Sequence, residues 1–487
     1  MMTEPGTEAP IREADRDRQL RRRDWRFLRP GTSLQHIQPP TGSALQGFAG
    51  RNPPGQGVYA EWRYPVPGGG ATIRKRLKSS GFQDVDLYWP WPGLRRPWFW
   101  LPLGSEAAAA YVRATRLPTR SLVRRVLDHP LRAVWRWAAA RQRLWPICAV
   151  ARVSDSSSPT HDLLDRIARE WAAWGLGQRP GRLSWLLLTR GARSINKVVG
   201  LVFAEPDASP RLVVKLPRAP DVHDALRREA AVLRAVHGRR PTGLPGAPRV
   251  LFCDEQSGGL TLCETALEGR PLFSLLAKST YRDLAMKATE WLVELAGMPS
   301  DPGARAGANE VGAITQEFAT MFGAVLNPME LWTTERLLAP LADLPTVPEH
   351  RDFSPWNVHI ARDGALAVYD WESAEPAAFP LNDLIYFLSY LAFFYERAIA
   401  SGRCTESYRR ARDPSTFTGG VYRDCLAHYC ERIGLDPRHA AALHLLTWII
   451  HSRSEYRRLV ADSGGQPAAA ALAKSLFLQL WREELRR

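Results

Sequence analysis

One stretch constrains the fold of this chain more than any other: His350 to Glu372, which reads HRDFSPWNVHIARDGALAVYDWE. Val358 to Ile360 is apolar-polar-apolar, Arg362 to Gly364 is a turn signal, and Leu366 to Val368 again places apolar residues two apart. Two short alternating segments around a glycine-containing turn predict a β-hairpin.

A hairpin closes on itself, so its open end should bring Asn357 and Asp370 side by side. Asp352 lies five residues before Asn357, on a loop stiffened by Pro355. These side chains are all oxygen donors, which suit Mg²⁺ completed by phosphate oxygens and water. A carboxylate that does not bind the metal could accept a proton from an attacking hydroxyl. The alternative is a structural hairpin that carries surface carboxylates.

At these residues the sequence resembles the aminoglycoside phosphotransferase and choline kinase family. The family's catalytic loop is His-Gly-Asp with an Asn five residues later, followed after a short hairpin by an Asp-Trp/Phe-Glu-like motif. The matching motifs here are HRD ending at Asp352, Asn357, and DWE beginning at Asp370; Arg351 replaces the usual glycine. The resemblance implies that Asp352 is the catalytic base, Asn357 a metal ligand and Asp370 the principal Mg²⁺ ligand.

The resemblance also implies the fold class α+β: a bilobal protein-kinase-like fold with a small antiparallel β N-lobe and a helical C-lobe. ATP would be the phosphoryl donor. Periodicity predicts the C-lobe helices at about 383–399, 419–433, 437–461 and 467–486. Asp383 should brace the catalytic loop, and His350 should orient that loop by hydrogen bonding.

Lys215 stands inside the apolar strand 212–216, where a lysine is disfavoured unless it is paired. A helix is predicted from Val222 to His237, and Glu229 lies on its apolar stripe. The two side chains therefore suggest a buried ion pair, which in kinase-like folds positions the α- and β-phosphates. The alternative is an edge lysine whose ammonium group extends to water.

The turn 190–197 lies between two predicted strands, 186–189 and 198–203. The resemblance implies that this turn covers the ATP phosphates with backbone N–H groups. The best candidates for phosphate contact are Gly191, Ser194 and Asn196.

The strand Leu260 to Glu264 is followed by the opening Gly269-Arg-Pro271, which resembles the hinge of the family. This position implies that adenine would bond to backbone groups around Glu264 to Ala266.

The chain has 487 residues, so we expect two or more domains. The segment 154–160, SDSSSPT, predicts a linker between a basic region, residues 1–153, and a kinase-like domain, residues 161–487. The N-lobe would run to about residue 265 and the C-lobe from about 266. The net charge of +15 is uneven, because residues 1–150 hold 25 Lys+Arg against 11 Asp+Glu, and the rest hold 40 against 39.

The basic region, a smaller α/β region, has a strand–helix–strand pattern over 57–63, 71–80 and 85–88. Together with Gly81-Phe82 this pattern resembles the last third of a class I methyltransferase. No glycine-rich turn after a strand and no acidic residue beyond it are present to hold a cofactor. The resemblance therefore implies a remnant without an S-adenosylmethionine site.

Residues 87–103 and 119–145 combine tryptophans with arginines, and nine of the 18 tryptophans fall in the first 150 residues. These stretches fit ordinary packed elements with an Arg-rich solvated face, a contact with an anionic membrane, or a protein partner. No recognised nucleic-acid motif accompanies them, so nucleic acid is not an expected partner. Without a spanning apolar run or a secretory signal, and with six scattered cysteines, we expect a cytoplasmic protein, with peripheral membrane contact left open.

Residues 401–487 carry 14 Lys+Arg against 9 Asp+Glu, which disfavours a polycationic acceptor. We therefore predict an ATP- and Mg²⁺-dependent kinase for a small-molecule hydroxyl, such as that of a sugar or polyol. The alternative is a nucleotide-binding scaffold that is anchored to a membrane or a partner by its basic N-terminal region.

Overall fold

The structure is a computed structural model. It describes residues 23–30, 32–115, 145–153, 162–189, 197–239, 242–256, 259–297, 308–463 and 465–487. The chain divides into two compact units: Met1–Arg227 with Val250–Ala266, and Arg228–Arg249 with Leu267–Arg487. The first is built on a large β-sheet and the second is mostly helical, so the predicted α+β fold class is confirmed.

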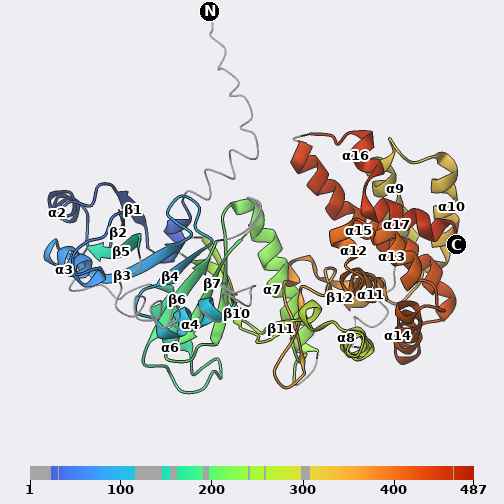
Figure 1. Cartoon of the computed structure of the whole chain (residues 1–487), viewed down its shortest axis with the longest axis horizontal. Helices are drawn as coiled ribbons and strands as arrows, with labels where there is room; N and C mark the ends of the chain where they lie inside the picture. The colour runs from blue at the N-terminus through green and yellow to red at the C-terminus, as the bar shows by residue number, and fades with distance from the viewer. Residues whose placement is uncertain are drawn as a thin grey trace, which may run out of the picture. The chain divides into compact units, whose positions relative to one another are not determined.

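The first unit contains a ten-stranded sheet in the order β1-β2-β5-β3-β4-β6-β7-β8-β10-β9 (Figure 1). β1 and β2 pair in parallel, and the other neighbours pair antiparallel. The strands are β1 Leu34–Ile37, β2 Gly57–Trp62, β3 Phe82–Trp91, β4 Phe99–Pro102, β5 Ile147–Val153, β6 Leu183–Leu188, β7 Lys197–Ala204, β8 Pro210–Pro217, β9 Val250–Gln256 and β10 Gly259–Thr265.

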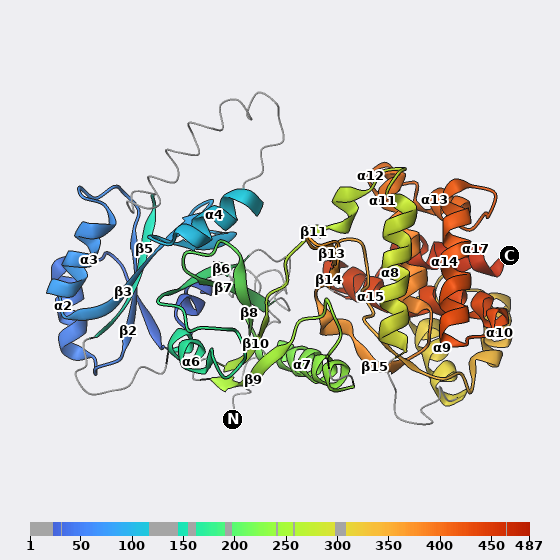
Figure 2. The same ribbon diagram turned by 90° about the horizontal axis from the view of Figure 1, so that it is seen from below.

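Side chains of successive strand residues point to opposite faces of this sheet, and each face has its own core. On β5, Ile147 and Ala149 belong to one core, whereas Cys148 and Val150 belong to the other. Helices α2 Gly42–Arg51, α3 Gly70–Ser79 and α4 Glu106–Thr115 pack on the first face. The 3₁₀ helix η1 Asp24–Leu28 and helix α6 Leu163–Glu170 pack on the second. Figure 2 shows α2 and α3 beside β2 and β3.

Strands from both sides of the predicted linker share this sheet. In the pairing of β4 with β6, Phe99 lies opposite Leu188 and Trp100 opposite Leu187. The predicted strand–helix–strand pattern at 57–88 is confirmed as β2, α3 and β3. The linker itself, 154–160, lies outside the described residues, so the domain boundary stays a prediction, as does the methyltransferase remnant.

Several tryptophans of the Trp/Arg-rich stretches are interior residues. Trp89 and Trp100 are 6% and 2% exposed and belong to the two cores of the sheet. Trp98, in contrast, is 45% exposed. Burial of Trp89 and Trp100 fits the interpretation of ordinary packed elements for that part of 87–103. Most of the second stretch, 119–144, lies outside the described residues.

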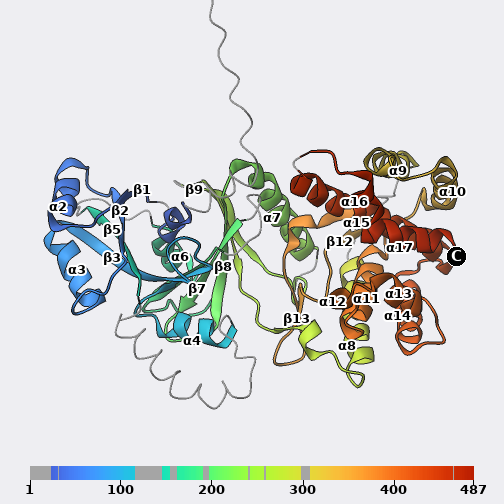
Figure 3. The ribbon, with the colours of Figure 1, turned by 45° about the horizontal axis from the view of Figure 1, so that its top comes forward.

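The second unit contains most of the helices and two small sheets, in the orders β11-β13-β14 and β12-β15. The strands are β11 Arg270–Pro271, β12 Val347–Glu349, β13 Val358–Ile360, β14 Leu366–Val368 and β15 Glu375–Ala378. The helices are α8 Tyr281–Ala296, α9 Ala308–Phe322, α10 Pro328–Leu338, α11 Asn382–Tyr395, α12 Ala398–Ser401, α13 Cys404–Ala411, α14 Phe417–Ile433, α15 Ala440–Ser463, α16 Ala469–Ala473 and α17 Leu476–Leu485. The helices predicted at about 419–433 and 437–461 are confirmed as α14 and α15. The single helices predicted at about 383–399 and 467–486 are each divided in two, because Arg397 has a φ of 55° and Ser475 caps the start of α17. Helices α15 and α17 lie side by side (Figure 3). Helix α7, His223–Gly238, matches the helix predicted from Val222.

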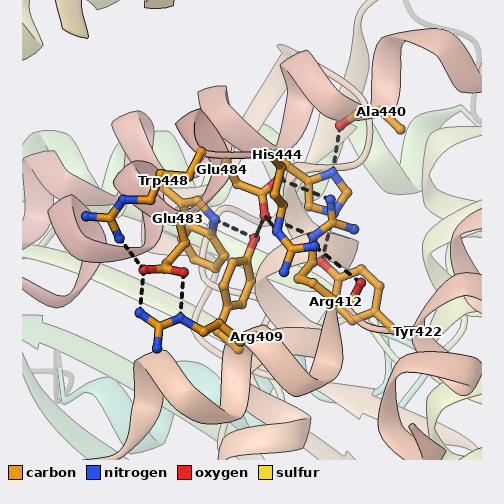
Figure 4. A network of polar contacts seen from close by, with 11 residues as sticks. Arg409, Arg412, Tyr422, Ala440, His444, Trp448, Glu483 and Glu484 are labelled. Carbon is orange, nitrogen blue, oxygen red and sulfur yellow. Dashed lines mark hydrogen bonds and ion pairs between the residues drawn. The ribbon is translucent and has the colours of Figure 1, made fainter. Parts of the chain in front are cut away.

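A buried polar network connects the last helix, α17, to α13, α14 and α15 (Figure 4). The Arg412 guanidinium donates to both carboxylate oxygens of Glu484 at 2.9 and 3.0 Å, and the Tyr408 hydroxyl donates to Glu484 at 2.8 Å. Arg409 binds Glu483 with two hydrogen bonds of 2.7 and 2.8 Å. Burial opposes ionisation of Glu484, but His444 and the Arg412 guanidinium together hold the pKa of Glu484 below its usual value.

Among the helices in the described part of the chain, none has a long enough apolar run to span a membrane. All six cysteines are free thiols.

Candidate functional site

The predicted hairpin is confirmed. β13 and β14 pair antiparallel with Val358 opposite Val368, and the turn closes at Gly364 with a positive φ of 85°. At the open end the Tyr369 N–H donates to the Asn357 carbonyl at 2.9 Å. Asp370 follows directly, in a left-handed conformation with φ 64°. The backbone ladder therefore places Asn357 and Asp370 at the same end of the hairpin.

The catalytic loop brings Asp352 to the same place. The Asn357 side-chain amide donates to the Asp352 carboxylate at 2.8 Å and to the Asp352 carbonyl at 3.0 Å. Both bonds use the amide nitrogen, so they fix the orientation of the Asn357 side chain and direct its carbonyl oxygen away from Asp352. The structure thus brings together two of the predicted residues by direct contact and the third through the hairpin.

Asp383, at the start of α11, holds the loop by its backbone. Its two carboxylate oxygens accept from the N–H groups of His350 at 2.6 Å and Arg351 at 2.8 Å. The His350 ring is bonded to the Tyr369 carbonyl at 2.8 Å, which connects the loop to the hairpin. These contacts confirm the predictions that Asp383 braces the catalytic loop and that His350 orients it. Arg351, which replaces the usual glycine, has a φ of 67°, so the loop keeps a conformation that favours glycine.

The site concentrates negative charge on two half-buried carboxylates, those of Asp352 and Asp370. Burial and, after it, the charge of Asp370 raise the pKa of Asp352 to about 8, and the hydrogen bond from Asn357 opposes the shift. Burial likewise raises the pKa of Asp383 to about 6. Like charges that are held close together disfavour ionisation of each other. Such an arrangement gains stability when a cation binds near Asp370.

The donor set fits Mg²⁺. The carbonyl oxygen of Asn357 and the carboxylate of Asp370 are hard ligands, and one or two carboxylates plus phosphate oxygens are the usual protein site for this ion. Within the described ranges no group of three or more His, Cys, Asp or Glu side chains is placed to hold a metal by itself.

Two further carboxylates of the predicted site have partners of their own. The Lys215 ammonium group forms an ion pair with Glu264 at 2.6 Å. This contact arises because β8 pairs with β10, where Glu264 lies opposite Val213 and so on the same face as Lys215. Glu229 accepts a hydrogen bond of 3.1 Å from the backbone N–H of Trp371, next to Asp370. The predicted Lys215–Glu229 pair stays a prediction.

Sequence reasoning assigned a backbone role near adenine to Glu264 and missed its side chain. An acidic residue inside the apolar run LTLCET was a signal of the same kind as Lys215. At the other predicted adenine contact, the Ala266 N–H donates to the Arg211 carbonyl at 3.0 Å. The phosphate-contact candidates Gly191, Ser194 and Asn196 lie outside the described residues.

A second buried layer beneath the loop was also not predicted. The Asn382 amide donates to the Glu349 carboxyl at 3.3 Å, and the Thr447 hydroxyl donates to the Asn382 side-chain carbonyl at 2.9 Å. Burial and the neighbouring Asp383 raise the pKa of Glu349 well above its usual value. No sequence motif marks these residues.

Residues 201–414 match the family model described as the phosphotransferase enzyme family. This part of the chain is thus similar to that family. The matched segment contains Asp352, Asn357 and Asp370, as the motif predicted.

The solved structures that match this chain include aminoglycoside phosphotransferases. APH(2'')-Ib with ADP bound is 14% identical, with 65% of this chain and 99% of that chain covered and a TM-score of 0.40. A thermostable mutant of APH(4)-Ia is 16% identical over 62% and 96% of the two chains, with a TM-score of 0.36. APH(3'')-Id from Streptomyces rimosus is 14% identical over 59% and 97%, with a TM-score of 0.35. The comparison with curated proteins gives no match.

Proposed function

We propose that this protein transfers the γ-phosphoryl group of ATP to a hydroxyl of a small molecule. The observation that carries the proposal is the meeting of Asp352, Asn357 and Asp370 at the open end of one hairpin, inside the family-matched segment. A structural hairpin does not need two half-buried carboxylates whose charges repel each other.

In the proposed reaction Asp352 accepts the proton of the acceptor hydroxyl as its oxygen forms a bond to the γ-phosphorus. The bond between that phosphorus and the bridging oxygen of ADP breaks, and ADP leaves with the electron pair. Asn357 and Asp370 would hold Mg²⁺, which when bound supplies positive charge to the phosphate oxygens. The loop backbone, fixed by Asp383, keeps the Asp352 carboxylate in place before the acceptor arrives.

For the nucleotide, we propose that Lys215 contacts the phosphates and that Gly191, Ser194 and Asn196 contribute to the loop that covers them. A lysine only 5% exposed inside a β-strand costs free energy unless its charge is paired, and Glu264 provides that charge before ATP binds. The backbone around Glu264 to Ala266 would bind adenine.

The acceptor class we propose is a neutral sugar or polyol. A polycation needs acidic side chains that are available to it. Several acidic residues of the C-terminal helices are instead paired with arginines: Glu396 with Arg410, Glu483 with Arg409, and Glu484 with Arg412. The remaining charge balance of 401–487 is positive.

The test is a product assay with ATP, Mg²⁺ and a panel of sugars, polyols and kanamycin-like aminoglycosides, read by mass spectrometry. We expect a phosphorylated neutral acceptor with the wild type, and a loss of about 100-fold or more with Asp352→Ala. Phosphorylation of an aminoglycoside in preference to every neutral acceptor would contradict the acceptor class. Binding of ATP without any transferred phosphate would contradict the enzyme and favour a nucleotide-binding scaffold.

A further inference from the structure

Four aromatic side chains form a continuous row beside the catalytic loop. Trp356, in that loop, meets Tyr390 of α11 edge to face, with ring centroids 5.0 Å apart and planes at 90°. The Trp356 ring also contacts Phe394, one helical turn further along α11, with centroids 5.8 Å apart. Phe394 in turn stacks on Phe273 of the 3₁₀ helix η3, Leu272–Leu275, with centroids 5.0 Å apart and planes at 18°. We call these four side chains the aromatic row.

The aromatic row is connected to the proposed catalytic base through the backbone of the loop. Trp356 immediately precedes Asn357, whose side-chain amide donates to the Asp352 carboxylate at 2.8 Å. At the other end of the row, the Phe273 N–H donates to the carbonyl of Pro355, the residue just before Trp356. The segment that positions Asp352 therefore also carries the central ring of the row.

The rings of the aromatic row keep part of their surface open to solvent. Phe273 is 38% exposed, and the other three residues are half-buried. Tryptophans in the core of the same unit differ, because Trp371, Trp448 and Trp481 are each 0% exposed. Covering accessible aromatic surface with an apolar part of a ligand is favourable, and the row offers such surface next to the reacting groups.

The spacing of the rings disfavours a cationic ligand. Centroid separations of 5.0 to 5.8 Å are contact distances for aromatic pairs, so an ammonium group does not fit between neighbouring rings. An aromatic cage for such a group needs several ring faces around a shared space. The nearby carboxylate of Glu396, two residues after Phe394, is already paired with Arg410.

A continuous row of rings suits a neutral ligand that is itself a ring. One face of a pyranose ring presents C–H groups, and burial of these groups against aromatic side chains is favourable. An acyclic polyol has no fixed face, so it would lose more conformational freedom when it binds to the row.

We propose that the aromatic row binds the ring of the acceptor, and that the acceptor is a cyclic sugar with one hydroxyl directed to Asp352. Trp356 is then a specificity-determining residue. This inference rests on the proposed function, and it narrows the proposed acceptor class from sugars and polyols to pyranose rings.

Replacement of Trp356 tests the row through the kinetics of the acceptor. In Trp356→Ala we expect KM for methyl hexopyranosides to rise by about tenfold, with kcat and KM for ATP within about twofold of the wild type, because stacking contributes equally before and during transfer. Trp356→Phe keeps an aromatic face and should recover most of this loss.

The matched control is Trp332→Ala, and we expect wild-type kinetics for it. Trp332 is 51% exposed on α10, where the Arg336 guanidinium lies over its ring at 4.6 Å. Equal effects of the two alanine variants, or a rise of KM for ATP as large as that for the sugar, would overturn the inference.

Matched pairs of acceptors, each hexose with the alditol formed by its reduction, test the requirement for a ring. We expect the wild type to prefer the hexose by about tenfold in kcat/KM, and Trp356→Ala to lose most of this preference. A wild type that prefers the alditol, an ammonium alcohol or an aminoglycoside would overturn the inference.

Saturation-transfer NMR with methyl hexopyranosides, ADP and Mg²⁺ gives a second readout that needs no phosphate transfer. We expect saturation to reach the C–H protons of one sugar face in the wild type and in Trp332→Ala, and to fall by at least about half in Trp356→Ala. No transfer in the wild type, or equal transfer in all three proteins, would overturn the inference. If the wild type phosphorylated no acceptor, the proposed function would fail, and this measurement would still decide whether the row binds a sugar ring.

Discussion

The second unit contains two clusters of carboxylates whose pKa values are shifted in opposite directions. In the C-terminal network, Glu484 is held by the Arg412 guanidinium, and its pKa is lowered. At the hairpin, Asp352 is half-buried, and its desolvation together with the charge of Asp370 raises its pKa to about 8. Within the fold, arginine neutralises the charge of the first cluster. At the second cluster, binding of a cation or a proton would reduce the repulsion between the carboxylates.

This difference indicates that the first cluster stabilises the fold and that the second serves function. The Glu484–Arg412 pair joins α17 to α13 and gives stability without any ligand. The hairpin cluster opposes the stability of the ligand-free fold, and strain of this electrostatic kind is typical of sites that bind ions or transfer protons. Substitutions in the two clusters should therefore have opposite effects on stability.

The largest expected effect is the loss of stability when Glu484 is replaced. Replacing it in Glu484→Gln leaves the buried Arg412 without its anionic partner, and we expect the free energy of unfolding to fall by about 3 kcal/mol. The measurement is urea unfolding at pH 7. Glu406→Gln, a neutral substitution at an exposed glutamate of the same helix pair, is the control and should change stability by less than about 0.5 kcal/mol. A loss no larger than that of the control would contradict the assigned role.

A similar effect is expected in the first unit, where Arg218 binds both oxygens of Asp24 at 2.9 Å. The Arg218 and Asp24 side chains are 0% and 4% exposed. Asp24→Asn should therefore destabilise the fold by roughly 3 kcal/mol, measured by the same unfolding method, whereas Asp224→Asn at an 89% exposed side chain should not. Equal behaviour of the two variants would show that residues 24–28 are not part of the first unit's folded core.

At the hairpin, we expect a substitution to increase the stability of the fold. Because the folded pKa of Asp352 is above its unfolded value, stability falls as the pH rises from about 4 to about 8. Asp352→Asn removes this loss, so in metal-free buffer the variant should be more stable than the wild type, by on the order of 1 kcal/mol or more at pH 8. Its advantage should shrink toward pH 4. A variant less stable than the wild type across this range would contradict the proposed repulsion.

The smallest expected effect is the acid dependence of the C-terminal network. The folded pKa of Glu484 is depressed, so its contribution to stability is present above the unfolded pKa and is lost as the pH falls through the folded value. Between pH 5 and pH 3 the wild type should lose about 1 kcal/mol more than Glu484→Gln. Parallel pH profiles of the two proteins would show that this carboxylate does not carry the acid sensitivity.

The parts of the site that are determined by residues close together in the sequence were predictable. The alternation around Gly364 fixes the hairpin, and the hairpin fixes the proximity of Asn357 and Asp370. The helices at 419–433 and 437–461 were predictable from the helical period of their apolar residues. The role of Asp383 as a brace was predicted from the family's helix start and is confirmed by its two backbone contacts.

Contacts between distant segments were not predictable in the same way. The ion pair of Lys215 with Glu264 depends on the register of β8 against β10, which no local pattern specifies. The pairing of β4 with β6, which places strands from both sides of the linker in one sheet, depends on non-local hydrogen bonds.

The most direct test of the central claim is calorimetric binding of ATP, with and without Mg²⁺, to the wild type and to Asp370→Asn. The account predicts that Mg²⁺ strengthens ATP binding to the wild type by about tenfold or more, because the ion relieves the repulsion at the hairpin while it binds phosphate. In Asp370→Asn this Mg²⁺-dependent gain should disappear, and binding of ATP alone should be kept. An equal Mg²⁺-dependent gain in both proteins would contradict the assignment of the hairpin as the metal and phosphate site.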